Sequence, residues 1–113
     1  MVLPNAERAE IDPAKITGYL LSSGHPIGRY KRPIFLSLGY SLEQWTKLRD
    51  DLLAHTATGE VVQGQYSKYG QKYEVRGILT GPSGKQVAIK SVWIILVGDK
   101  NPRFVTAFPG EKT

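Results

Sequence analysis

QVAIKSVWIILV, residues 86–97, decides the fold, because its β-branched and aromatic residues alternate as they do in a β-strand. Alternation divides the side chains between two faces. One face carries Val87, Ile89, Trp93, Ile95 and Val97, and the other carries Ala88, Lys90, Val92, Ile94 and Leu96. Both faces are apolar near the end of the segment, which predicts a central strand with a neighbour on each side.

Three further strands are predicted around this one, over residues 60–66, 71–79 and 103–108. The connections GPSG (81–84) and GDKN (98–101) are so short that the strands they join must be antiparallel neighbours. On the second strand, one face carries Tyr73, Val75 and Leu79, and the other carries Lys72, Glu74 and Arg76. On the fourth strand, alternation places one set of side chains on one face, Phe104, Thr106 and Phe108, and another on the opposite face, Arg103, Val105 and Ala107.

The first half of the chain is predicted to be helical. Asp12 is the expected N-cap of a first helix, with Pro13 at the first helical position and an end near residue 23. A second helix spans residues 29–38, with Pro33 in its first turn, where proline is tolerated. A third helix runs from the N-cap Ser41 to about residue 54, and its buried stripe is Leu42, Trp45, Leu48 and Leu52.

These elements predict an α+β fold, in which three N-terminal helices pack on a four-stranded antiparallel β-meander. A length of 113 residues corresponds to a single domain, residues 1–113. The helices are expected to cover one face of the sheet. The other face is then left as an open polar groove that carries Lys72 and Arg76, joined by Arg103 or Thr106.

Composition narrows the function classes. The chain has no cysteine, which excludes disulfide scaffolds, cysteine nucleophiles and thiolate metal sites. His25 and His55 lie 30 residues apart without carboxylates at ligand spacing, so we expect neither a metal site nor a cofactor. No apolar run is long enough to span a membrane and no export signal is evident, so we expect a cytoplasmic protein with no membrane partner.

The charge favours a polyanionic partner. Fifteen Lys and Arg residues against ten Asp and Glu residues give a net charge of +5. The excess is uneven, since from Pro13 onward 14 basic residues face 7 acidic ones. A basic surface suits nucleic acid, although proteins that bind none also carry a charge of this size.

HPIGRYKR, residues 25–32, is the most informative polar stretch, because it sets an imidazole and three cations at the start of a helix. Helix N-termini attract anions, so a phosphate is expected there with Arg29, Lys31 or Arg32 around it. In the alternative interpretation, His25 and Pro26 form an ordinary turn and the cations are solvated.

Two further stretches mix polar and aromatic residues. YSKYGQKY, residues 66–73, interleaves tyrosines with lysines as in segments that stack bases and hold phosphates, or its tyrosines pack at the sheet edge, as we expect for Tyr73. PRFVTAFP, residues 102–109, contains Arg103 and Thr106, which could clamp and orient a phosphate. In the alternative interpretation, both are simply exposed strand residues. Trp93 is expected in the core, and His55 at the C-terminal end of a helix, where it matches the dipole.

Five short motifs follow one another along nearly the whole chain. They are Leu3-Pro4-Asn5-Ala6, Tyr19-Leu20-Leu21, His25-Pro26-Ile27-Gly28-Arg29 with Lys31, Val92-Trp93-Ile94-Ile95 and Arg103-Phe104-Val105-Thr106-Ala107. In this order they resemble a small bacterial family, domain of unknown function 6883. Its members occur alone or at the C-termini of toxin-like proteins, next to a small partner gene. The resemblance implies a small acidic antitoxin or immunity protein as partner.

The layout of helices followed by a four-stranded antiparallel sheet is also similar to the barnase, EndoU, colicin and RelE-like ribonuclease toxins. Those enzymes cleave RNA without metal, through attack of the 2′-hydroxyl on its own phosphate. The similarity implies that His25 is the base or the acid, that Lys31 and Arg103 neutralise the transition state, and that Thr106 orients the phosphate. The residues expected to hold RNA around that centre are Arg29, Tyr69, Lys72 and Arg76.

The first interpretation is therefore a metal-independent endoribonuclease toxin of a toxin–antitoxin or polymorphic-toxin system, with its basic groove blocked by an acidic partner. Two alternatives stay open: a non-catalytic module that binds an acidic protein or nucleic acid, and a structural phage or effector accessory domain. An exposed edge at the first or fourth strand also allows a homodimer. The enzyme interpretation requires His25, Lys31, Arg103 and Thr106 within reach of one phosphate.

Overall fold

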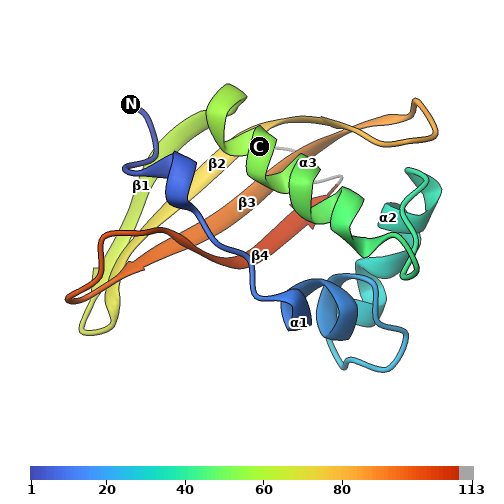
Figure 1. The fold of residues 1–113 in the computed structure, drawn as a ribbon, viewed down its shortest axis with the longest axis horizontal. Coiled ribbons are helices and arrows are strands. Elements are labelled where there is room, and N and C mark those ends of the chain that lie inside the picture. The colour runs from blue at the N-terminus through green and yellow to red at the C-terminus, as the bar shows by residue number, and fades with distance from the viewer. Residues whose placement is uncertain (110–113) are drawn as a thin grey trace.

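The computed structural model describes residues 1–109, in which helical segments precede and cover one face of a four-stranded antiparallel sheet (Figure 1). The helical segments are η1 (Ala6–Arg8), α1 (Pro13–Lys15), η2 (Ile16–Leu20), η3 (Gly28–Tyr30), α2 (Arg32–Ser37) and α3 (Trp45–Thr58). The strands are β1 (Glu60–Ser67), β2 (Gly70–Thr80), β3 (Gln86–Leu96) and β4 (Arg103–Pro109). The α+β class is confirmed. No helix in this part of the chain has the length and apolarity needed to cross a membrane.

The sheet has the order β1-β2-β3-β4, and each neighbouring pair is antiparallel. The prediction that residues 86–97 form a central strand is confirmed, because β3 pairs with β2 along its whole length and with β4 on its other side. Gly98 adopts a φ of +83° in the β3–β4 connection, a conformation that favours glycine. Predicted and observed strand ends differ by one residue at most positions, since turn residues mark them locally.

A β-bulge in β4 corrects the predicted faces of this strand. Val92 pairs with Thr106 and Trp93 pairs with Phe104, so Val105 is an extra residue on β4. The extra residue reverses the alternation, and both Phe104 and Ala107 are buried against the helices. Placing Phe104 and Thr106 on one face was therefore wrong. Thr106 instead shares the open face with Arg103, whose partner Ile94 lies on the same face of β3 as Val92.

The first predicted helix is shorter than expected and changes type. Asp12 is its N-cap as predicted, since its Oδ1 accepts a hydrogen bond of 3.0 Å from the amide of Ala14. Beyond α1, the amide of Leu21 donates to the carbonyl of Ile16, which is the spacing of a π-helical turn. The wider turn lets the adjacent residues Leu20 and Leu21 both join the core, and the helix ends at residue 20 rather than near 23.

The second predicted helix is divided in two. A 3-10 turn, η3, is followed by α2, which begins at Arg32 and has Pro33 in its first turn. Proline has no amide hydrogen and clashes with the preceding turn, so a continuous helix over residues 29–38 cannot form.

The third helix starts and ends later than predicted. Ser41 accepts a hydrogen bond of 3.2 Å from the amide of Gln44, but this contact lies in the loop before Trp45, where α3 begins. Leu42 therefore lies outside the helix and is 52% exposed, contrary to its predicted burial. Leu48 and Leu52 are buried as predicted.

The core centres on Trp93, which is fully buried as predicted. Its ring meets the Phe104 ring edge-to-face with centroids 5.3 Å apart, and its Nε1 donates a hydrogen bond of 2.8 Å to Ser91 Oγ. The other side of this serine faces the imidazole of His55, with 3.5 Å between Oγ and Nδ1. The network joins α3 to β3 through the middle of the protein.

His55 lies in the last turn of α3, as predicted, but it does not serve there as a cation that matches the helix dipole. Its side chain is buried, with 4% of the residue exposed, because α3 continues to Thr58 and turns this position toward the sheet. Burial lowers the pKa of His55, so the neutral ring is favoured rather than a cation that matches the helix dipole. Among the described residues, Nε2 of His55 has no hydrogen-bond partner.

The burial of His55 makes stability depend on pH. A histidine whose pKa is lowered in the folded state binds its proton more readily in the unfolded state, so stability falls as the pH drops below the unfolded value of about 6.5. The slope reaches at most about 1.4 kcal/mol per pH unit. Urea unfolding at pH 7.5 and 5.5 measures it. We expect His55→Gln to remove this fall, whereas His25→Gln, which keeps His55, retains it. An unchanged slope in His55→Gln would refute the assignment.

Candidate functional site

The candidate site is centred on the hydroxyl of Thr106, on the open side of β4. Tyr19 OH lies 2.7 Å from Thr106 Oγ1, and Lys31 Nζ donates to the same oxygen over 3.2 Å. The Lys31 ammonium also donates to the carbonyl of Ala107 over 2.7 Å. Two residues that lie 75 to 87 positions earlier in the sequence, Tyr19 and Lys31, are thus joined to Thr106 and Ala107 in one hydrogen-bonded cluster.

The Lys31 side chain is held firmly at this place. Its Nζ lies 3.8 Å from the centroid of the Phe108 ring and 5.7 Å from that of Tyr19. Cations over aromatic faces are attracted by the ring quadrupole. No carboxylate forms an ion pair with Lys31 within residues 1–109. A positioned cation without a counterion is suited to an anionic ligand such as a phosphate.

His25 lies on the other side of Tyr19, with the two ring centroids 4.8 Å apart and an angle of 70° between the rings. Its Nδ1 accepts hydrogen bonds from the amides of Ile27 and Gly28, both at 3.0 Å. A neutral ring held in this way carries its proton on Nε2. In this conformation His25 is therefore a hydrogen-bond donor through Nε2, and Nδ1 has the structural task of capping η3.

Gly28 explains how the sequence brings these groups together. It is buried, and a Cβ at this position would overlap the carbonyl oxygen of Tyr19. Only glycine permits η3 to approach η2 so closely, and this approach brings His25 and Lys31 next to Tyr19. Tyr19 itself belongs to the π-helical turn, a feature that often accompanies functional sites.

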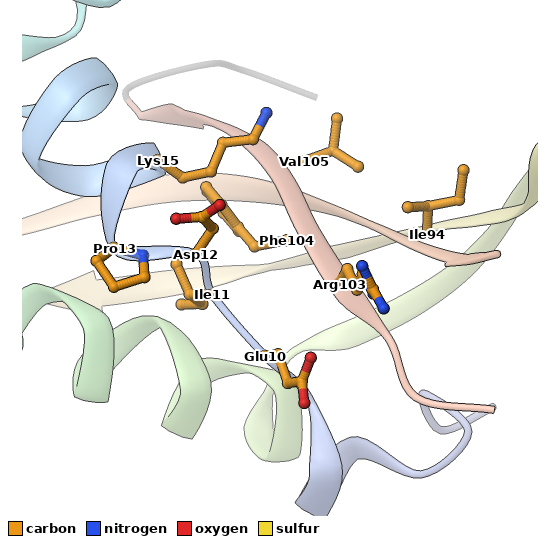
Figure 2. Close-up of a pocket in the computed structure, with 9 residues that line it drawn as sticks. All are labelled: Glu10, Ile11, Asp12, Pro13, Lys15, Ile94, Arg103, Phe104 and Val105. Carbon is orange, nitrogen blue, oxygen red and sulfur yellow. The ribbon is translucent and has the colours of Figure 1, made fainter. Parts of the chain in front are cut away.

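Three adjoining clefts lie along β4, and Thr106 lines two of them. The first, of about 480 Å³, is lined by Lys15, Tyr19, His25 and Thr106 among others. The second, of about 370 Å³, contains Lys72, Glu74, Thr106 and Phe108. The third, of about 640 Å³, contains Glu10, Asp12, Lys15 and Arg103 (Figure 2). Val105 lines all three, so the clefts form one track across the open face.

The residues expected to act on one phosphate are not all at the same point. His25, Lys31 and Thr106 meet around Tyr19. Arg103 lies in the 640 Å³ cleft instead, with its Nη2 3.3 Å from the carboxylate of Asp99. It is adjacent to the Thr106 cluster, through Val105, rather than part of it.

The expected RNA-holding residues are spread more widely. Lys72 lines the 370 Å³ cleft beside Thr106. Arg76 is held by Glu74 through a contact of 2.8 Å, and Arg29 donates a hydrogen bond of 2.9 Å to Tyr30 OH. Tyr69 lies in the β1–β2 turn and is 64% exposed. Arg29, Tyr69 and Arg76 line none of the three clefts.

Sequence reasoning missed Tyr19 and Lys15 as site residues. Tyr19 enters the sequence analysis only through the motif Tyr19-Leu20-Leu21, which carries part of the family resemblance. Lys15 Nζ lies 5.8 Å from the Tyr19 ring centroid and lines two of the clefts. Within residues 1–109, no three histidine, aspartate or glutamate side chains are grouped so that they could hold a metal ion.

Comparison with known proteins assigns the family. The model of a domain of unknown function (DUF6883) matches residues 2–111. The chain belongs to this family. The DUF6883 chain is also similar in fold to a chain of a solved contact-dependent growth inhibition toxin–immunity protein complex from Klebsiella pneumoniae 342, with a TM-score of 0.68 and 19% sequence identity. The match covers 95% of the DUF6883 chain and 97% of the other chain. No curated protein matches the DUF6883 chain significantly in sequence.

Proposed function

We propose that this protein is a metal-independent endoribonuclease toxin of a toxin–antitoxin or polymorphic-toxin system, held inactive by an acidic antitoxin or immunity protein. The observation that carries the proposal is the Thr106 cluster, where the Lys31 ammonium, which has no carboxylate partner among residues 1–109, meets two hydroxyl groups on an open face. Such a set of fixed donors stabilises the charge that develops on a phosphate during transfer, without rearrangement at the moment of reaction.

In the proposed reaction, a ribose 2′-oxygen forms a bond to phosphorus and the bond from phosphorus to the 5′-oxygen of the next nucleotide breaks. The products end in a 2′,3′-cyclic phosphate and a 5′-hydroxyl. The proton of the 2′-hydroxyl passes to water, the leaving 5′-oxygen takes a proton from the Lys31–Tyr19–Thr106 cluster, and water then returns a proton to the cluster. Lys31 neutralises the phosphoryl oxygens, and Thr106 orients them.

We assign His25 to the phosphate through its Nε2 proton. As a general base it would need a free lone pair on Nε2, and the proton would then move to Nδ1, which faces the amides of Ile27 and Gly28. Both hydrogen bonds would be lost. A neutral imidazole that donates to the phosphate keeps them and adds a further donor to the site.

The rest of the track would hold the RNA on both sides of the reacting phosphate. Lys72 lies in one adjoining cleft and Arg103 in the other, so each neutralises the backbone or contacts the base of a neighbouring nucleotide. In this proposal Arg29, Tyr69 and Arg76 contact nucleotides farther along the strand.

The charge of this chain favours the role of the toxin over that of the immunity protein. The structurally similar chain comes from a toxin–immunity protein complex, so either role is open to its fold. The present chain carries a net charge of +5, and Lys31, which forms no ion pair within residues 1–109, adds local positive potential. A protein that acts on RNA needs such a surface, and an acidic partner blocks it by complementary charge.

The experiment is incubation of the purified full chain with total RNA in EDTA, beside a Thr106→Val variant. We expect the wild type to give discrete fragments that end in 2′,3′-cyclic phosphate, and the variant to give few or none. Thr106→Val removes the hydroxyl while keeping the shape of the side chain, and its thermal unfolding should stay close to that of the wild type. Intact RNA in the presence of folded wild-type protein would overturn the proposal.

A non-catalytic binding module is the second candidate, favoured by a specific observation. Both His25 Nδ1 and the Thr106 hydroxyl are already engaged in hydrogen bonds, and no carboxylate contacts Lys31 in the described part of the chain. A site without an available proton acceptor can hold a phosphate without cleaving it. In this case the same RNA would bind, in a salt-dependent way, and remain intact.

A further inference from the structure

We infer that the 640 Å³ cleft of Figure 2 recognises a nucleobase of the RNA, and that the base it fits is guanine. This inference rests on the proposed function, because it identifies the base next to the phosphate at Thr106. The cleft belongs to the same track as the Thr106 cluster, since Asp12, Lys15 and Val105 line both the 640 Å³ cleft and the cleft of His25.

Two charged side chains line this cleft next to each other, and both extend from a backbone that is held by hydrogen bonds. Glu10 and Arg103 are partners in a parallel bridge at the outer edge of β4. The amide of Glu10 donates to the carbonyl of Pro102, and the amide of Phe104 donates to the carbonyl of Glu10, both over 2.9 Å. Side chains of bridge partners lie on the same side of the sheet, and both Glu10 and Arg103 line the cleft (Figure 2). Their spacing is therefore set by main-chain hydrogen bonds.

The charges in the cleft suit a base better than a phosphate. Two carboxylates, those of Glu10 and Asp12, line it together with Arg103 and Lys15. Carboxylates repel phosphate oxygens but accept hydrogen bonds from the N–H groups of bases. The remaining walls are apolar, with Ile94 and Val105 on the open face of the sheet. Planar ligands with polar edges bind in sites of this kind.

The pairing of one carboxylate with one guanidinium favours guanine. Guanine carries N–H groups on two adjacent positions of its Watson–Crick edge, and a single carboxylate can accept from both. It also presents O6 and N7, the acceptor pair that an arginine binds bidentately. These edges adjoin each other on the ring, as Glu10 and Arg103 adjoin each other on the protein. None of adenine, cytosine and uracil offers both patterns.

Glu10 is free to make these contacts. Within residues 1–109 it takes part in no ion pair, whereas Arg103 is steadied by Asp99 at 3.3 Å. Asp12 is engaged as the N-cap of α1. Glu10 is therefore the carboxylate that reads the base, and Asp12 closes the wall of the cleft.

NMR titration of the full chain with each of the four nucleoside 3′-monophosphates tests the inference. The four ligands share one phosphate and differ only in the base. We expect guanosine 3′-monophosphate to bind roughly tenfold more tightly than the other three. Glu10→Gln should bring its affinity to within about twofold of theirs, because the amide cannot accept from both guanine N–H groups. Glu7→Gln, which removes a neighbouring exposed carboxylate outside the cleft, should leave the preference unchanged.

The outcomes separate this inference from the proposed function. Equal affinity for the four nucleotides, weakened in each case by Thr106→Val, would overturn base recognition and leave the phosphate site standing. A guanine preference that survives in Glu10→Gln would also overturn the role of Glu10. If no nucleotide binds the folded wild type, both the phosphate site and the base site are refuted. Because the titration needs no cleavage, a binding module without activity would still give the guanine preference.

Discussion

We expect Lys31→Met to lower the rate of the proposed RNA cleavage by roughly 10²–10³-fold, the cost of removing one fixed donor from a developing anion. The ammonium reaches Thr106 Oγ1 and has no carboxylate partner among residues 1–109, so its charge is available to the phosphate. Methionine keeps the length of the stem and its packing on Phe108 while the charge is lost. Cleavage of a fluorescent oligoribonucleotide, measured below and above saturation, gives the effect on kcat and KM.

A second lysine provides the control. Lys85 lies in the β2–β3 connection, where its Nζ is 3.4 Å from Ser37 Oγ, whereas the Nζ of Lys31 contacts Thr106 Oγ1. Lys85→Met removes the same charge from the protein. It should change the cleavage rate less than about twofold, because solvent screens a surface charge that lies outside the site. Lys31→Met also loses the hydrogen bond to the Ala107 carbonyl. Comparison with Lys31→Arg, which keeps the charge, shows whether this loss affects folding. Equal rates in Lys31→Met and Lys85→Met would contradict a role for Lys31 in the reaction.

The strands could be predicted because their signals are local. Alternation of apolar residues and glycine-containing turns fix strand type and ends within a few residues. The bulge at Val105 could not be predicted, because it depends on which residue of β3 faces which residue of β4. The helices were less predictable for a similar reason. Ile16, Leu20 and Leu21 form a π-helical turn because all three are needed in the core, and Leu42 stays exposed because α3 begins only at Trp45.

The site was predicted from residue chemistry but not from geometry. Lys31 and Thr106 were singled out because a cation and a hydroxyl stood beside other polar residues in short motifs. Their contact depends on the bulge, which turns Thr106 to the open face, and on Gly28, which lets η3 approach η2. Arg103 lies on the other side of the β-bulge from Thr106 and therefore lines the neighbouring 640 Å³ cleft. Tyr19 escaped attention because a tyrosine among leucines in a helical stretch is usually a core residue.

Trp93→Ala lowers the free energy of unfolding by roughly 3–5 kcal/mol, the range for truncating a large buried aromatic side chain. The indole is fully buried, so its removal leaves a cavity between α3 and the sheet. It also removes the hydrogen bond from Nε1 to Ser91 Oγ and the edge-to-face contact with Phe104. Urea unfolding followed by circular dichroism at pH 7.5 measures the loss. Against a total stability of about 5–15 kcal/mol for a typical domain, this loss is a large fraction of the whole.

Trp93→Phe separates packing from hydrogen bonding in the same place. Phenylalanine keeps an aromatic ring against Phe104 but leaves Ser91 Oγ without its donor, so we expect a loss of about 1–3 kcal/mol. Trp45→Ala is the matched control, because Trp45 is only partly buried at the start of α3. Its loss should be smaller than that of Trp93→Ala. Because Phe104 pairs with Trp93 next to the bulge that orients Thr106, Trp93→Phe should also weaken phosphate binding at the site, whereas Trp45→Ala should not. Unchanged phosphate binding in Trp93→Phe would mean that the bulge is fixed by the β3–β4 hydrogen bonds alone.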